Sequence, residues 1–153
     1  MVGHPARRPE RGIMKHVAEL LSKASKPVIY AGHGCTLCRP VFEWFINEMN
    51  IPVLLSWRAI DLLPEGHPLL IGRPGLIAQP EANKRMMEAN LILVLGARLD
   101  DSVTCYNLSG FAPDAVKIVV DVDKAELNRL PDNYHKVNME VADFMRRMRE
   151  EIG

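Results

Sequence analysis

The hydrophobic residues of this chain follow two alternating patterns. In the first, apolar side chains recur every three or four residues, the period of one face of an α-helix. This spacing predicts helices over residues 13–24, 41–49 and 141–152, and shorter helices are expected at residues 81–89 and 124–130. In the second, short runs rich in aliphatic residues stand between glycine, proline or polar residues, which is typical of buried strands. These runs predict strands at residues 28–31, 51–55, 69–71, 91–95, 116–120 and 136–138.

Regular alternation of strands and helices indicates the fold class. It predicts an α/β fold with a doubly wound, mostly parallel six-stranded sheet and helices on both faces, in other words a Rossmann-like domain. Residues 13–153 supply this domain. Residues 1–12 hold two prolines, two glycines and three arginines with almost nothing apolar, so we expect a flexible tail or linker there.

Composition excludes several classes of protein. Lys and Arg total 19 and Asp and Glu total 19, so the net charge is zero, which argues against a broad nucleic-acid or membrane surface. No apolar run reaches the roughly 18 residues that a membrane span needs. Three cysteines do not make a disulfide scaffold, and the arginine-rich start is not followed by the apolar segment of a signal peptide. We therefore expect a cytoplasmic protein.

The segments after the predicted strands carry the candidate chemistry. Ligands of open parallel sheets bind outside the carboxyl ends of the strands, near the point where strand order reverses. Glycines let a backbone approach a phosphate, arginines match its charge, and carboxylates accept from ribose hydroxyls. The segments begin at Gly32, Ser56, Gly72, Gly96 and Asp121. Gly and Asp are also ordinary turn residues, so a nucleotide site and plain turn chemistry both remain open.

A nicotinamide dinucleotide site fits poorly. Gly32 and Gly34 supply the first two glycines of the fingerprint, but the third position is Leu37. About twenty residues on, where an acidic residue should meet the ribose, stand Ser56 and Trp57.

Cys35 and Cys38 form a C-x-x-C sequence at the predicted start of a helix. A thioredoxin-type motif has this setting, because a helix N-terminus lowers a thiol pKa. A zinc site would lack partners, since neither the remaining cysteine nor the histidines have metal-binding spacing. Alternatively, two small thiols simply pack the turn.

Four segments together resemble a known family. They read LLPEGHPLLIGRPG (residues 62–75), Glu81-Ala82-Asn83, LILVLGARLDDSVT (residues 91–104) and VKIVVDVDKAEL (residues 116–127). In order and spacing they are similar to the central domain of thiamine-diphosphate-dependent enzymes, nearest to acetolactate synthase large subunits. The resemblance covers roughly residues 13–152.

The resemblance implies a middle domain that is not catalytic alone. Family enzymes bind thiamine diphosphate and Mg²⁺ through two outer domains, one with an activating glutamate and one with a G-D-G motif, and this sequence has neither. The middle domain binds FAD in acetolactate synthase and ADP or nothing in relatives. The family's flavin-contacting positions fall on Gly32, His33, Gly34, Ser56, Trp57, Arg58, Gly75, Leu76, Gly96, Ala97, Arg98, Asp100, Asp121, Val122, Asp123 and Glu126.

Three departures from the family's sequence motifs affect which ligand this domain could bind. The arginine after the paired aspartates is Ser102, a histidine–glycine pair is Ile77-Ala78, and the central glycine of the first turn is His33. Each removes a phosphate donor or adds bulk, so FAD, ADP and no ligand all remain open.

Three hypotheses follow. The chain is the nucleotide-binding or structural middle domain of a thiamine-diphosphate enzyme, a lyase or transferase by resemblance. It is a free-standing adenine-nucleotide-binding module. Or it is a thiol oxidoreductase that uses Cys35 and Cys38. The first implies other thiamine-enzyme domains as partners and a homo-oligomer, with no nucleic-acid or membrane partner; we expect no metal site and no catalytic residue in this chain.

Overall fold

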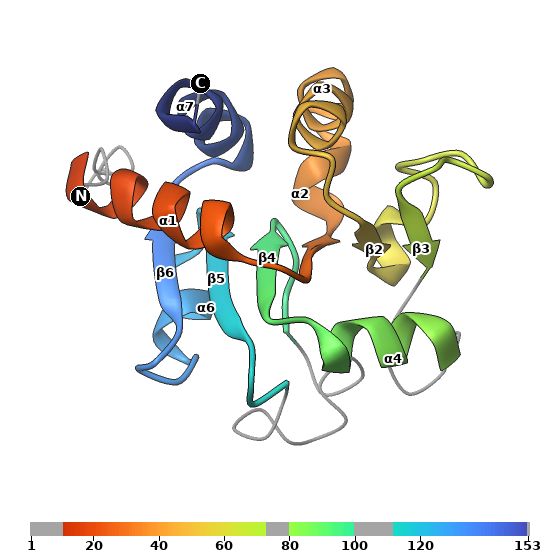
Figure 1. Cartoon of the computed structure of the whole chain (residues 1–153). Helices are drawn as coiled ribbons and strands as arrows, with labels where there is room; N and C mark the ends of the chain where they lie inside the picture. Colours follow the sequence, from red (N-terminus) through yellow and green to blue (C-terminus); the bar gives the residue numbers. More distant parts are fainter. Residues whose placement is uncertain (1–10, 73–79, 100–111, 153) are drawn as a thin grey trace.

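The computed structural model describes residues 11–72, 80–99 and 112–152 (Figure 1). Its helices are α1 (Arg11–Lys23), α2 (His33–Thr36), α3 (Arg39–Met49), α4 (Pro80–Glu88), α6 (Lys124–Asn128) and α7 (Val141–Ile152), and a 3₁₀ turn covers Trp57–Ala59. Its strands are β1 (Pro27–Ala31), β2 (Val53–Leu55), β3 (Leu70–Gly72), β4 (Leu91–Leu95), β5 (Val116–Asp121) and β6 (His135–Asn138).

The strands form one six-stranded sheet in the order β3-β2-β1-β4-β5-β6. All pairings among these strands are parallel. The predicted doubly wound α/β fold is therefore confirmed. The chain moves outward in one direction from β1 to β3 and in the other from β4 to β6. The strand order consequently reverses between β1 and β4, which is where ligands bind in such sheets.

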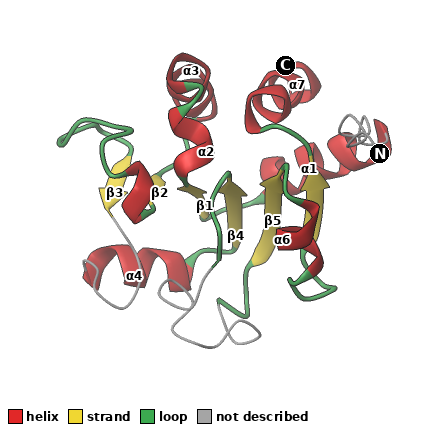
Figure 2. Ribbon diagram, turned by 180° about the vertical axis from the view of Figure 1, so that it is seen from behind, coloured by secondary structure: helices red, strands yellow, loops and turns green. Residues whose placement is uncertain are grey.

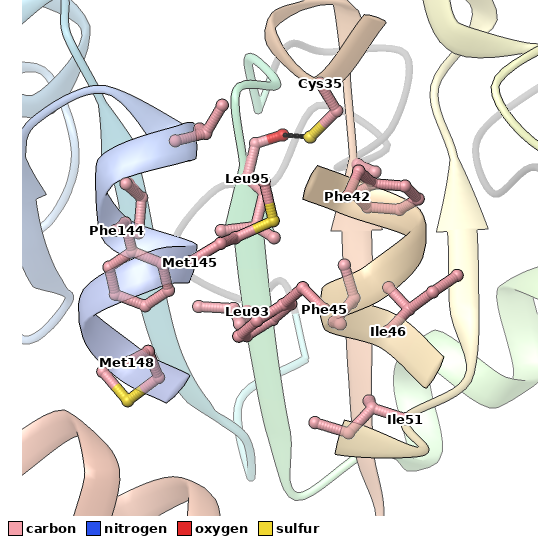
Figure 3. Close-up of a cluster of buried hydrophobic side chains, with 14 of the residues drawn as sticks. Cys35, Phe42, Phe45, Ile46, Ile51, Leu93, Leu95, Phe144, Met145 and Met148 are labelled. Carbon is pink, nitrogen blue, oxygen red and sulfur yellow. Dashed lines mark hydrogen bonds between the residues drawn. The ribbon is translucent and has the colours of Figure 1, made fainter. Parts of the chain in front are cut away.

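Hydrophobic cores lie on both faces of the sheet. On one face, α1, α3 and α7 bury Val17, Phe42, Phe45 and Phe144 against the strands. Figure 3 shows side chains of α3 and α7 on either side of Leu93 and Leu95 of β4. On the other face, Ala82 and Met86 of α4 and Leu127 of α6 pack against Ile92 and Val94, and Figure 2 shows α6 in front of the part of the sheet that β5 and β6 form. Burial on both faces explains why the sequences of the inner strands β1, β2, β4 and β5 are mainly aliphatic.

Several element boundaries differ from the predicted ranges by one or two residues. Helix α1 begins at Arg11, so residues 11 and 12 belong to a helix and not to the expected tail; residues 1–10 lie outside the described part. Helix α3 begins at Arg39, because Pro40 is well tolerated in a first turn. Helix α2 covers His33–Thr36, so the helix expected at Cys35 is a separate four-residue helix and not the beginning of α3.

Candidate functional site

The glycines after β1 and β4 pack against each other at the point where strand order reverses. The Gly34 N–H donates to the Gly96 carbonyl at 3.1 Å, and the Gly32 N–H donates to the Leu95 carbonyl at 3.0 Å. A Cβ on Gly32 would lie 2.4 Å from the Ala97 Cα, and Gly96 has a φ of +61°. Side chains at these positions would collide or be strained, so the glycines have a structural reason as well as a functional one.

Beside these glycines lies a pocket of about 540 Å³, which we call the carboxyl-edge pocket. It is formed by the segments after β1, β2, β4, β5 and β6. Its lining residues are His33, Gly34, Leu37, Cys38, Arg58, Gly96, Arg98, Asp121, Val122, Asp123, Glu140, Val141 and Ala142. Segments far apart in the sequence thus meet at one edge of the sheet.

Many, but not all, of the residues singled out from the sequence line this pocket. Gly32 and Ala97 are buried beneath it. Ser56 precedes the 3₁₀ turn after β2 and Trp57 begins it, and neither is among the lining residues. Gly75, Leu76 and Asp100 lie outside the described residues.

Arg98 and Asp123 form an ion pair at the pocket wall. The Arg98 Nη2 lies 3.1 Å from the Asp123 Oδ2, and the Arg98 side chain is 68% exposed. The other Asp123 oxygen caps α6, accepting from the Ala125 N–H at 2.9 Å and from the Glu126 N–H at 3.4 Å. Asp123 therefore joins the segment after β4 to the start of α6.

Asp121 is held in the turn between β5 and α6. Its Oδ1 accepts from the Asp123 N–H at 2.8 Å, and the Asn138 side-chain amide donates to the Asp121 and Val122 carbonyls, each at 3.0 Å. Burial raises the pKa of Asp121 more than the hydrogen bond from Asp123 lowers it. The backbone of this turn is thus fixed from both sides before any ligand is present.

Glu126 is not among the residues that line the pocket. Its carboxylate is 2% exposed and forms an ion pair with Arg129, Nε to Oε1 at 2.7 Å and Nη2 to Oε2 at 2.8 Å. Arg129 Nη2 also donates to the Leu99 carbonyl. The sequence pattern D-x-D-x-x-E showed an acidic residue near the site but not that this residue points into the protein.

The two cysteines of the C-x-x-C sequence are free thiols. Cys35 is fully buried and lies 3.3 Å from the Leu95 carbonyl, and burial strongly raises the pKa of its thiol. Burial is also the main cause that raises the pKa of Cys38. Redox-active motifs need an exposed thiol with a lowered pKa. The geometry is therefore that of packing residues.

Sequence reasoning missed the contribution of α7 to the pocket. Glu140, Val141 and Ala142 follow the last strand and line the pocket, as does the exposed Leu37 after α2. The rule that ligand-binding residues follow parallel strands would have found Glu140, because it comes two residues after β6. Leu37 carries no such signal.

The described part of the chain has no helix long and apolar enough to cross a membrane. Nor do three His, Cys, Asp or Glu side chains gather anywhere in that part so that they could hold a metal ion.

A six-stranded parallel sheet with a pocket at its reversal point defines a Rossmann-like α/β domain. Residues 14–148 match the family model "Thiamine pyrophosphate enzyme, central domain", and the chain belongs to this family. The resemblance seen in the sequence is confirmed.

Relatives and a solved structure agree with this family. The chain is 30% identical over 132 residues to the large subunit of acetolactate synthase isozyme 1 from Escherichia coli, covering 86% of this chain. It is 32% identical over 128 residues to the acetolactate synthase large subunit of Corynebacterium glutamicum, covering 82% of this chain. A thiamin diphosphate-dependent enzyme from Mycobacterium smegmatis superposes with a TM-score of 0.76 at 19% identity, covering 94% of this chain and 28% of that one. The chain spans 23% and 20% of the length of the two synthases.

Proposed function

We propose that this chain is the nucleotide-binding central domain of a thiamine-diphosphate-dependent enzyme similar to acetolactate synthase, and that its carboxyl-edge pocket binds an adenine nucleotide. One observation carries the proposal: segments after five strands bring two arginines and three carboxylates to a single pocket at the reversal point of the sheet. Its volume of about 540 Å³ is in the range of small-molecule sites.

The lining residues suggest how a nucleotide would lie. Arg58 and Arg98 would meet phosphate oxygens through charge-assisted hydrogen bonds. Asp121 or Asp123 would accept from a ribose hydroxyl or the adenine amine. Leu37 and Val122, which are 81% and 60% exposed, would gain contacts with the base.

ADP fits this pocket better than FAD. His33 lines the pocket where relatives of the acetolactate synthase type have glycine, so bulk is added beside the close-approach position. A dinucleotide needs more of that space than a mononucleotide does.

A purely structural role without a ligand is the second candidate, and specific contacts favour it. The Gly34 N–H already donates to Gly96, and Arg98 is already paired with Asp123. A nucleotide would therefore have to displace Asp123 from Arg98. Such exposed pairs contribute only about 0–1 kcal/mol, so a phosphate could compete for the guanidinium.

Thiamine diphosphate and Mg²⁺ would belong to other domains of the parent enzyme, which we propose as partners in a cytoplasmic homo-oligomer. Within the described residues, the acidic and histidine side chains are not grouped to hold a metal ion. We expect the isolated chain to bind neither group.

Calorimetric titration with ADP and FAD tests the nucleotide site. We expect ADP to bind, and Arg98→Ala to weaken binding by about 1.5–3 kcal/mol, roughly ten- to a hundredfold. Arg149→Ala is the matched control, because Arg149 pairs with Glu48, also on the surface, but does not line the pocket. Absence of binding at millimolar nucleotide would leave the structural role as the better description.

A further inference from the structure

The buried carboxylate of Glu126 has no role in the pocket, yet both of its oxygens are used. They accept from Arg129 at 2.7 and 2.8 Å. Bidentate pairing of this kind fixes a guanidinium in both position and orientation. Glu126 therefore determines where the Arg129 side chain points.

Arg129 in turn contacts the segment that carries Arg98. Its Nη2 donates to the Leu99 carbonyl, so one nitrogen bridges the buried carboxylate and the backbone after β4. Ala97 and Leu99 are 3% and 1% exposed, whereas Arg98 between them is exposed. The segment is thus anchored on both sides of Arg98.

Helix α6 contacts this segment at both of its ends. Asp123 at its N-terminus pairs with the Arg98 side chain at 3.1 Å, and Arg129 at its C-terminus holds the Leu99 carbonyl. The ion pair of Arg98 with Asp123 is between exposed groups and contributes little stability by itself. The contact of Arg129 with Leu99 is held by the buried Glu126 carboxylate through charge-assisted hydrogen bonds, which are stronger than neutral ones.

We propose that Arg129, oriented by Glu126, is a positioning residue that sets the backbone at Leu99 and thereby points Arg98 into the carboxyl-edge pocket. This inference rests on the proposed function only in that the ligand of Arg98 is taken to be a phosphate of an adenine nucleotide. The positioning of the backbone itself does not depend on that ligand.

A double-mutant cycle with ADP tests the coupling. In the wild-type background, Arg98→Ala should lower ADP affinity about ten- to a hundredfold. In an Arg129→Lys background the same substitution should lower it less than about threefold. The reason is that lysine cannot both pair with the two oxygens of Glu126 and donate to the Leu99 carbonyl, so Arg98 is no longer held in place. If Arg129 were merely structural, the two effects would multiply, and the inference would be overturned. Arg149→Lys is the matched control and should leave the effect of Arg98→Ala unchanged.

Backbone ¹⁵N relaxation supplies a second readout that needs no ligand. The order parameters of Arg98 and Leu99 should fall in Arg129→Lys, while that of Ser56, after β2, stays at its wild-type value. Unchanged order parameters at both Arg98 and Leu99 would overturn the inference, whether or not ADP binds. Absence of ADP binding to the wild-type protein would refute the proposed function but not this inference. If Arg129→Lys does not fold, Glu126→Gln keeps the side-chain volume and removes half of the bidentate acceptor, and the same changes are expected.

Discussion

Gly34 and Gly96 are in backbone contact across the reversal point of the sheet. The Gly34 N–H donates to the Gly96 carbonyl at 3.1 Å, and a Cβ on Gly96 would lie 2.8 Å from the Gly34 Cα. The segments after β1 and β4 are thereby held together without side chains. Both glycines also line the carboxyl-edge pocket, so this backbone contact forms part of the pocket wall.

Gly96→Ala should destabilise the fold. The φ of +61° is unfavourable for alanine, and the added methyl would meet backbone atoms that cannot move aside. The combined cost should be about 2–4 kcal/mol in the free energy of unfolding, measured by urea denaturation.

Gly12→Ala is the matched control. Gly12 lies in helix α1, and nothing is within 4 Å of an added Cβ. Alanine is the better helix former, so this change should stabilise the protein by up to about 1 kcal/mol. Equal losses from both substitutions would show that the contact between Gly34 and Gly96 is unimportant.

The thiol of Cys35 should not react in the native protein. It is fully buried, and burial strongly raises its pKa, so little thiolate forms at neutral pH. In a Cys105→Ser background, iodoacetamide at pH 8 should label Cys38 slowly and Cys35 only after unfolding, as read by mass spectrometry. Rapid labelling of Cys35, or reduction of insulin by wild-type protein, would revive the thiol oxidoreductase hypothesis.

Acid should weaken the contact between His16 of α1 and His135 of β6. Their ring centroids lie 5.3 Å apart, and the pKa of His135 is lowered by burial and then by His16. A histidine with a lowered pKa binds fewer protons when folded than when unfolded, so stability is retained above the unfolded pKa of about 6.5 and falls as pH drops below it.

His135→Gln should therefore flatten the fall in unfolding free energy between about pH 6.5 and 5. Urea denaturation at several pH values measures this slope. His33→Gln is the control, because His33 is exposed and lies at the carboxyl-edge pocket, outside this pair. If His33→Gln flattened the pH dependence of the unfolding free energy as much as His135→Gln does, the prediction would be contradicted.

The positions of β1, β2, β4 and β5 were predictable because most of their residues are buried on both faces of the sheet. Leu91–Leu95, for example, is aliphatic throughout and has no residue that favours solvent. The gathering of Gly34, Arg98 and Asp121 at one edge was predictable for a related reason, since all parallel strands end at the same edge.

Side-chain direction was not predictable in the same way. Glu126 and Asp123 are both acidic and three residues apart, yet one pairs with Arg129 inside the protein and the other caps α6 beside the pocket. The difference depends on which face of a five-residue helix meets β5, and so short a helix has no apolar period to reveal it. The ion pair of Arg98 with Asp123 joins residues 25 positions apart and was likewise invisible, since no local sequence pattern links the two residues.

The isolated chain should neither bind thiamine diphosphate nor decarboxylate pyruvate. The sequence lacks the G-D-G motif, and the chain spans only 23% of the Escherichia coli synthase subunit that it resembles. Calorimetry with thiamine diphosphate and Mg²⁺ should show no heat of binding. Micromolar affinity would show that the missing motif is replaced by residues that we have not recognised.

Asp123 has two functions that substitution can separate. One oxygen caps α6 and the other pairs with Arg98. Asn caps a helix about as well as Asp, so Asp123→Asn should leave the free energy of unfolding nearly unchanged, whereas Asp123→Ala should cost about 1 kcal/mol. If a nucleotide phosphate replaces Asp123 on Arg98, Asp123→Asn should also keep or raise ADP affinity, because the competing charge is gone. A loss of ADP affinity in Asp123→Asn without a loss of stability would instead mean that the carboxylate itself accepts from the ligand, and titration alongside urea denaturation distinguishes these outcomes.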